Sequence, residues 1–217
     1  MSWTRTAACC AACNFLRARI CARRHFRFVT TVFSAAIGWC WIIFIIYWIV
    51  SARGVKPVAQ RQNGAAMAAY RLPIIFGAIL LWGPTWRSEW GWNLAPQRDL
   101  LRAGGAVACV LGLGVAIWAR RTLAGNWSSD VTFKQGHELI ESGPYRFVRH
   151  PIYTGLILML LGTAMAKGRV QSWLGLLCQC IGFWIKLRQE EKVMLQHFPN
   201  EYPSYHKRVR ALVPFIL

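Results

Sequence analysis

The sequence predicts an all-α, polytopic membrane protein with about five transmembrane helices, and three observations support this prediction. Hydrophobic residues make up 55% of the 217 residues, and charged residues make up only 16%. A soluble protein of this size needs more charge to cover its surface, whereas helices that face lipid remove that need. Long apolar runs recur along the chain, and the basic residues gather between them, as is typical of the flanks of membrane helices.

The first apolar run, residues 28–50, is predicted to be a transmembrane helix. It follows a basic, cysteine-containing segment, residues 1–27. A secretory signal peptide is the alternative, but its apolar region is only about 7–15 residues long, and no small-residue cleavage site follows this run. At about 1.5 Å per residue the run can cross a hydrocarbon core of roughly 30 Å.

The second and third runs, 72–86 and 100–119, complete a three-helix region that covers residues 28–119. Pro73 and Pro84 flank the second run, so we expect a kinked or tilted span. The third run contains small residues that allow helices to approach closely in lipid. These are Gly104, Gly105, Gly112 and Gly114.

The fourth and fifth runs, 152–166 and 170–187, are separated only by a short turn at Lys167, Gly168 and Arg169. They are therefore expected to form a helical hairpin within a C-terminal region, residues 120–217. The polar stretches before and after the hairpin then emerge at the same membrane face. Ionisable groups at a membrane boundary are candidates for a functional site.

The net charge of +18 comes from 26 basic and 8 acidic residues. Because the basic residues lie between apolar runs, contact with anionic lipid headgroups explains the charge better than nucleic-acid binding does. With five spans, 15 basic residues fall on the side of the polar hairpin ends and 11 on the other side. The positive-inside rule then favours the cytoplasm for the hairpin ends, although six arginines in residues 1–27 argue the other way. No metal is expected, because no Cys or His pair at finger-like spacing completes the N-terminal cysteine cluster.

The most informative local string is GPYRFVRHPIYTG, residues 143–155. Pro151 suits the first turn of a helix, which places His150 near its N-cap beside free backbone N–H groups. Such a helix start, with Arg149 and His150, can hold an anion such as a carboxylate. Tyr153 follows one turn later and offers a ring and a hydroxyl group. A capping or interfacial histidine is the simpler alternative.

A second polar group follows the fifth run. Lys186 and Glu190 are four residues apart and share one helix face, while Arg188 and Glu191 lie on neighbouring faces. Alone, these residues could form a surface ion pair of little energetic value. Opposite the His150 loop, a functional role is favoured.

Five pieces in the C-terminal half resemble the isoprenylcysteine carboxyl methyltransferase family. They are HELIESGPY (137–145), RHPIYTG (149–155), RQEEKVML (188–195), FPNEYPSYHKRV (198–209) and Leu212-Val213-Pro214. The resemblance implies S-adenosylmethionine as the methyl donor, enclosed by the hairpin and the C-terminal segment at a cytoplasmic face. The cofactor contacts that it implies are His137, Glu138, Leu139, Ile140, Tyr145, His150, Pro151, Tyr153 and Glu190.

The resemblance also implies an acceptor carboxylate on a prenylated cysteine or another lipidic molecule. The family's substrate-binding arginine corresponds to Lys186, which keeps the charge but loses the bidentate fork. Arg188 is the alternative source of that fork, so Lys186, Arg188 and Glu190 are the candidate catalytic residues. A carboxylate is already ionised at neutral pH, and methyl transfer to it needs positioning rather than a strong base.

Three alternatives stay open from the sequence. The chain could methylate a phospholipid amine, it could be a membrane reductase of the sterol-reductase type with a nicotinamide cofactor, or it could be a non-catalytic membrane component. The acidic pair Glu190-Glu191 and the Arg149-His150-Pro151 string favour the methyltransferase.

Overall fold

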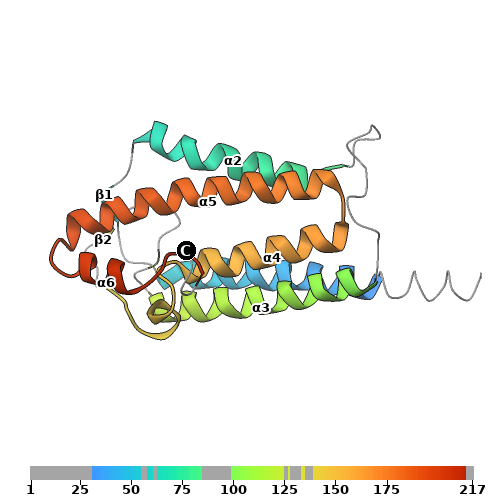
Figure 1. Ribbon diagram of the computed structural model, residues 1–217, viewed down its shortest axis with the longest axis horizontal. Coiled ribbons are helices and arrows are strands. Elements are labelled where there is room, and N and C mark those ends of the chain that lie inside the picture. Colours follow the sequence, from blue (N-terminus) through green and yellow to red (C-terminus); the bar gives the residue numbers. More distant parts are fainter. Residues whose placement is uncertain are drawn as a thin grey trace, which may run out of the picture.

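The computed structural model describes residues 31–54, 58–60, 63–84, 99–124, 127, 133–134 and 139–213. Its architecture is all-α, as the sequence predicts, apart from two short strands that pair antiparallel. The α-helices are Thr31–Ser51, which has no label in Figure 1, α2 (Gly64–Trp82), α3 (Asp99–Leu123), α4 (Pro151–Lys167), α5 (Val170–His197) and α6 (Tyr202–Arg208). The remaining elements are the 3₁₀ turns η1 (Ala52–Gly54) and η4 (Gly143–Arg146) and the strands β1 (Val58–Gln60) and β2 (Phe133–Lys134).

All five predicted apolar runs lie in helices over most of their described length; the second helix ends at Trp82, before Pro84, and residues 28–30 and 85–86 lie outside the described residues. Four of the helices, Thr31–Ser51, α2, α3 and α5, are long and apolar enough to cross a membrane, and α4 is a shorter apolar helix. The second span begins earlier than its central apolar run, so Pro73 lies inside α2 rather than at its start. Beyond its apolar run the fifth helix continues through the polar residues 188–197, as expected of a helix that leaves the membrane.

The helices form two layers (Figure 1). One layer contains α2 and α5, and the other contains α4, α3 and the helix Thr31–Ser51. The predicted hairpin between α4 and α5 joins the layers. Gly168 makes the turn with a φ of 63°, a left-handed conformation that favours glycine.

Glycines set the spacing within each layer. A Cβ added to Gly112 on α3 would lie 2.5 Å from the carbonyl oxygen of Gly155 on α4. In the other layer, a Cβ on Gly77 of α2 would lie 2.7 Å from the carbonyl oxygen of Gly175 on α5. Backbones therefore touch directly, as small residues permit in lipid.

Four glycines of α3 were expected to allow close approach of another helix, and not all of them do so. Gly105 and Gly112 contact the α4 backbone, and Gly104 faces the methyl group of Met165 at 3.6 Å. For Gly114 the expectation is wrong, because no described atom lies within 4 Å of a Cβ built there. The position of each glycine around the helix decides whether it contacts α4, since residues 105 and 112 are two turns apart on the face that meets α4.

Large side chains fill the space between the layers. Leu81 of α2, Leu160 of α4 and Leu187 of α5 are almost fully buried in one cluster. On the outside, apolar residues stay exposed on every long helix, for example Trp39, Ile46, Phe76 and Val110. An apolar exterior around a filled interior is what a bundle embedded in lipid requires.

Replacing Gly112 with leucine should destabilise the protein by about 1–3 kcal/mol, because the new side chain would have to push α3 and α4 apart. Gly114→Leu on the same helix is the matched control and should leave the melting temperature in detergent nearly unchanged. Equal effects of the two substitutions would contradict the packing described here.

Candidate active site

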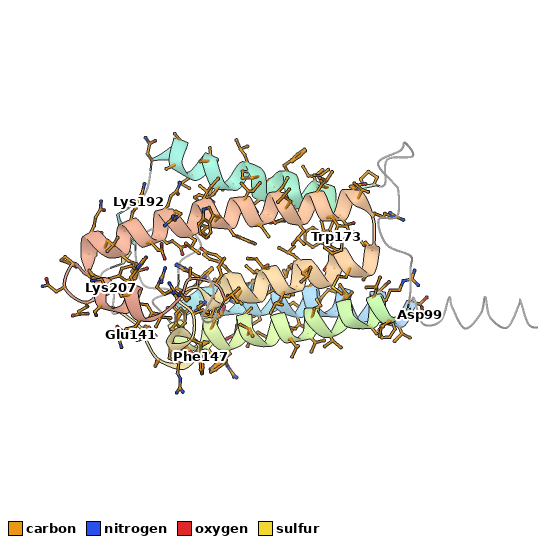
Figure 2. The ribbon with its side chains drawn as sticks, viewed as in Figure 1. Asp99, Glu141, Phe147, Trp173, Lys192 and Lys207 are labelled. Carbon is orange, nitrogen blue, oxygen red and sulfur yellow. The ribbon has the colours of Figure 1, made fainter. Side chains whose placement is uncertain are left out.

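The polar end of the bundle is built by the chain that leads into α4. Gly143 has a φ of 60° and packs against the side chain of Thr122. The turn η4 follows, and α4 then begins with His150 at its N-cap and Pro151 in its first turn. In Figure 2, Glu141, Phe147, Lys192 and Lys207 lie at this end, while Asp99 lies at the opposite end.

His150, Tyr153 and Glu190 form the centre of the site. The Tyr153 hydroxyl donates a hydrogen bond to Glu190 Oε1 at 2.5 Å, and His150 Nδ1 lies 3.5 Å from Glu190 Oε2. The His150 and Tyr153 rings stack with centroids 5.7 Å apart, and Tyr153 stacks on Phe183 at 5.4 Å. The start of α4 thus faces the C-terminal part of α5, as the predicted hairpin requires.

Lys186 lies beside this centre and points between the two layers. Its Nζ lies 5.5 Å from the centroid of the Tyr153 ring and 5.5 Å from that of Tyr70 on α2. Glu190 follows one helical turn later on the same face of α5. A cation, a carboxylate and two aromatic faces therefore converge near one point.

Arg188 turns to the outside of α5. Its guanidinium lies over the Trp184 ring at 5.0 Å, and its side chain is 61% exposed. It approaches the carboxylate of Glu191 only at 4.0 Å. Of the two cations expected at the site, Lys186 is the one that faces Tyr153.

Glu191 and Arg149 form a buried ion pair behind the centre. Arg149 Nη2 lies 2.5 Å and Nε 3.0 Å from Glu191 Oε1, and both side chains are almost inaccessible. Arg149 Nη1 also donates to the carbonyl oxygens of His206, at 3.0 Å, and of Val209. The anion held at this helix start is therefore the protein's own carboxylate, and Arg149 links this carboxylate on α5 to the end of α6.

That C-terminal segment pairs directly with the loop before α4. The backbone N–H groups of Arg149 and His150 donate to the carbonyls of Arg210 and Ala211 at 2.8 and 3.0 Å. Thr154 Oγ1 donates to the carbonyl of Leu212 at 2.7 Å. These bonds hold residues 210–212 across the start of α4.

Burial by itself would lower the pKa of His150. The carboxylates of Glu190 and Glu191 lie 3.5 and 3.6 Å from its two ring nitrogens, and their polar contact and negative charge outweigh burial, so the pKa of His150 lies above its usual value. The imidazolium form of His150 therefore suits the neighbouring carboxylates of Glu190 and Glu191.

Tyr145 is buried in η4, which raises the pKa of its hydroxyl. Its carbonyl accepts a hydrogen bond from the hydroxyl of Tyr205 at 2.6 Å.

The structure brings together most of the residues that the sequence singled out. Tyr145, His150, Pro151, Tyr153, Lys186 and Glu190 lie at this end of the bundle, and Leu139 and Ile140, half-buried, precede η4. His137 and Glu138 lie outside the described residues. Tyr70 was not expected, because an isolated tyrosine in a predicted span carries no motif.

Comparisons with known proteins match part of this chain to methyltransferases. Residues 100–201 match the family model described as phospholipid methyltransferase. Protein-S-isoprenylcysteine O-methyltransferase of Schizosaccharomyces pombe is 35% identical over 81 residues, which are 37% of this chain and 34% of the yeast protein. The protein of the same name from Saccharomyces cerevisiae is 29% identical over 118 residues, 52% of this chain and 48% of that protein. The human one is 29% identical over 128 residues, 58% of this chain and 45% of that protein.

The chain thus spans less than half the length of these curated relatives. The matched residues include the whole of α4 and α5, and with them His150, Tyr153, Lys186 and Glu190. The resemblance seen in the sequence motifs is therefore confirmed: residues 100–201 are similar to the phospholipid methyltransferase family, and the chain shares about 30% identity with isoprenylcysteine methyltransferases over part of its length.

Proposed function

We propose that this protein transfers a methyl group from S-adenosylmethionine to the carboxylate of a lipidic or prenylated-cysteine acceptor. The observation that carries the proposal is the convergence of His150, Tyr153, Glu190 and Lys186 at the polar end of an apolar bundle. This convergence falls in the region that matches methyltransferases. We further propose that this end of the bundle faces the cytoplasm.

The chemistry of the cluster fits such a donor. S-adenosylmethionine would supply an electrophilic methyl group on a positively charged sulfonium, together with amino, carboxylate and ribose groups. Glu190 offers a carboxylate to the positive groups, and the ring faces of Tyr153 and Phe183 attract cations as well. The Nε2 atom of His150 is buried and lies 3.6 Å from Glu191 Oε1, just beyond hydrogen-bond distance, so a polar ligand could share this nitrogen with the carboxylate.

The remaining predicted contacts would complete the cofactor site. His137, Glu138, Leu139 and Ile140 precede η4 in the sequence, and Tyr145 belongs to that turn. Pro151 fixes the start of α4, so His150 and Tyr153 are presented from a rigid helix end. In this proposal the chain from 137 to 145 covers the donor while α4 and α5 hold it.

Lys186 is the residue that we assign to the acceptor carboxylate. It faces the Tyr153 ring from within the bundle, whereas Arg188 faces outward. A carboxylate needs no deprotonation at neutral pH, so the protein has to orient the two reactants and exclude water. The apolar tail of the acceptor would stay among the membrane helices.

The description of the matched family favours a second acceptor, a phospholipid amine. Two physical arguments oppose it. An ammonium group must lose a proton before it can accept a methyl group, and a positively charged Lys186 beside Tyr153 would repel it. We therefore rank the carboxylate first.

Binding of S-adenosylhomocysteine to the protein in detergent tests the donor site. Wild-type protein should bind it by isothermal titration, and Glu190→Gln should weaken binding by about 10- to 100-fold, because a charge-assisted hydrogen bond is lost. Asp99→Asn, at the opposite end of the bundle, is the matched control and should bind normally. Absence of binding by folded wild-type protein, or stabilisation by NADPH instead, would overturn the proposal.

Transfer of a radiolabelled methyl group tests the acceptor. An N-acetylated prenylcysteine should be methylated in preference to phosphatidylethanolamine. Lys186→Met should lower kcat/KM for the acid by about 10- to 100-fold, because a desolvated charge pair is removed, while Arg188→Met should change it less than about threefold, as is usual for an exposed cation. The reverse order would reassign the carboxylate to Arg188, and labelled phosphatidylethanolamine would indicate the amine acceptor.

The raised pKa of His150 predicts a pH-dependent stability. In the unfolded chain the pKa of a histidine is about 6.5; since that of folded His150 is higher, its contribution is fully present below the unfolded value and is lost as the pH rises through the folded value. The difference in melting temperature between wild-type protein and His150→Gln should therefore shrink from about pH 6 upward. His206 is retained in both proteins, so comparing them isolates His150. A difference that grows with pH would contradict this assignment.

A further inference from the structure

Tyr70 is a buried tyrosine that the matched family region does not include. It lies on α2, before the matched residues 100–201, and is only 2% exposed. Its ring centroid lies 5.5 Å from Lys186 Nζ, the same distance as that of Tyr153. The Lys186 ammonium is therefore within cation–π range of one ring from each layer of the bundle.

The packing of α2 on α5 fixes the position of Tyr70. Gly182 precedes Lys186 by one turn on α5, and a Cβ there would lie 3.0 Å from the carbonyl oxygen of Tyr70. One turn to the other side, Gln189 Nε2 donates a hydrogen bond to the carbonyl of Ala66 at 3.1 Å. The backbone of α2 is thus held against α5 on both sides of Tyr70.

The two rings have a definite electrostatic consequence. A lysine ammonium is a point charge on a flexible stem, so it does not select a ligand geometry by itself. Two ring faces near the same Nζ restrict where the ammonium can lie and replace part of its hydration. The two rings therefore fix the position of the Lys186 ammonium relative to a bound carboxylate, as the planar guanidinium of an arginine would do.

We infer that Tyr70, Lys186 and Tyr153 form a headgroup subsite for a single carboxylate, with Tyr70 as a positioning residue that acts through Lys186. This inference rests on the proposed function. It adds to the proposed carboxylate site a residue of α2, a helix outside the family match.

The charge balance of the reaction explains what the subsite selects. A carboxylate oxygen forms a bond to the methyl carbon while the bond from that carbon to the sulfonium sulfur breaks. One negative and one positive charge disappear together, leaving a neutral ester and a neutral thioether, and no proton moves. The ester has no charge to bind Lys186, so the subsite favours the substrate over its product.

The test compares binding of an N-acetylated prenylcysteine with binding of its methyl ester, both to the full chain in detergent. Wild-type protein should prefer the acid. Tyr70→Leu should weaken acid binding by about 2- to 30-fold, as expected for loss of a cation–π contact, and should leave binding of the ester and of S-adenosylhomocysteine unchanged. Tyr70→Phe keeps the ring and should behave like wild type.

Phe76→Leu is the matched control, because Phe76 also lies on α2 but is 56% exposed on its outer face. Equal losses of acid and ester binding in Tyr70→Leu would show a packing role and overturn the inference. Loss of S-adenosylhomocysteine binding would place Tyr70 at the donor site instead. The acid–ester comparison measures binding directly, so it decides this inference even if methyl transfer is not observed.

Discussion

The buried ion pair between Arg149 and Glu191 is the interaction on which the site depends. Two buried charges are costly unless further hydrogen bonds compensate them. Here Arg149 also donates to two carbonyls near the C-terminus, and His150 Nε2 and His206 Nε2 lie 3.6 and 3.8 Å from the same carboxylate. One salt bridge therefore joins the loop before α4, the C-terminal part of α5 and the end of α6, and it holds His150 and Tyr153 close to Glu190.

The sequence could predict the membrane helices and the hairpin, because length and hydropathy determine both. Only Gly168 and Arg169 separate α4 from α5, and so short a turn requires the two helices to run antiparallel. That constraint alone predicted that His150 and Glu190 would meet. The polar residues beyond Leu187 continue α5 as a helix that ends before Pro199, as the sequence indicates. The start of α2 was less predictable, because Pro73 is accommodated within the helix.

The contribution of α2 could not be predicted in the same way. Its partner α5 is distant in the sequence, and the pairing depends on backbone contacts at Gly77, Gly175 and Gly182. Glycines in apolar runs indicate close packing without identifying the partner helix, and the misplaced expectation for Gly114 has the same origin. Tyr70 follows from that pairing, since the approach at Gly182 brings its ring to Lys186.

Helical periodicity explains how one short stretch of α5 can serve three purposes. Residues four apart share a face, so Lys186 and Glu190 both turn toward Tyr153. Glu191, one position further, is rotated toward Arg149 and becomes part of the structural ion pair. Arg188 is rotated away from both and rests on Trp184 at the surface. Adjacent acids thus have different surroundings, one next to the aromatic rings and the other buried by arginine, and a substitution at either should affect a different property of the protein.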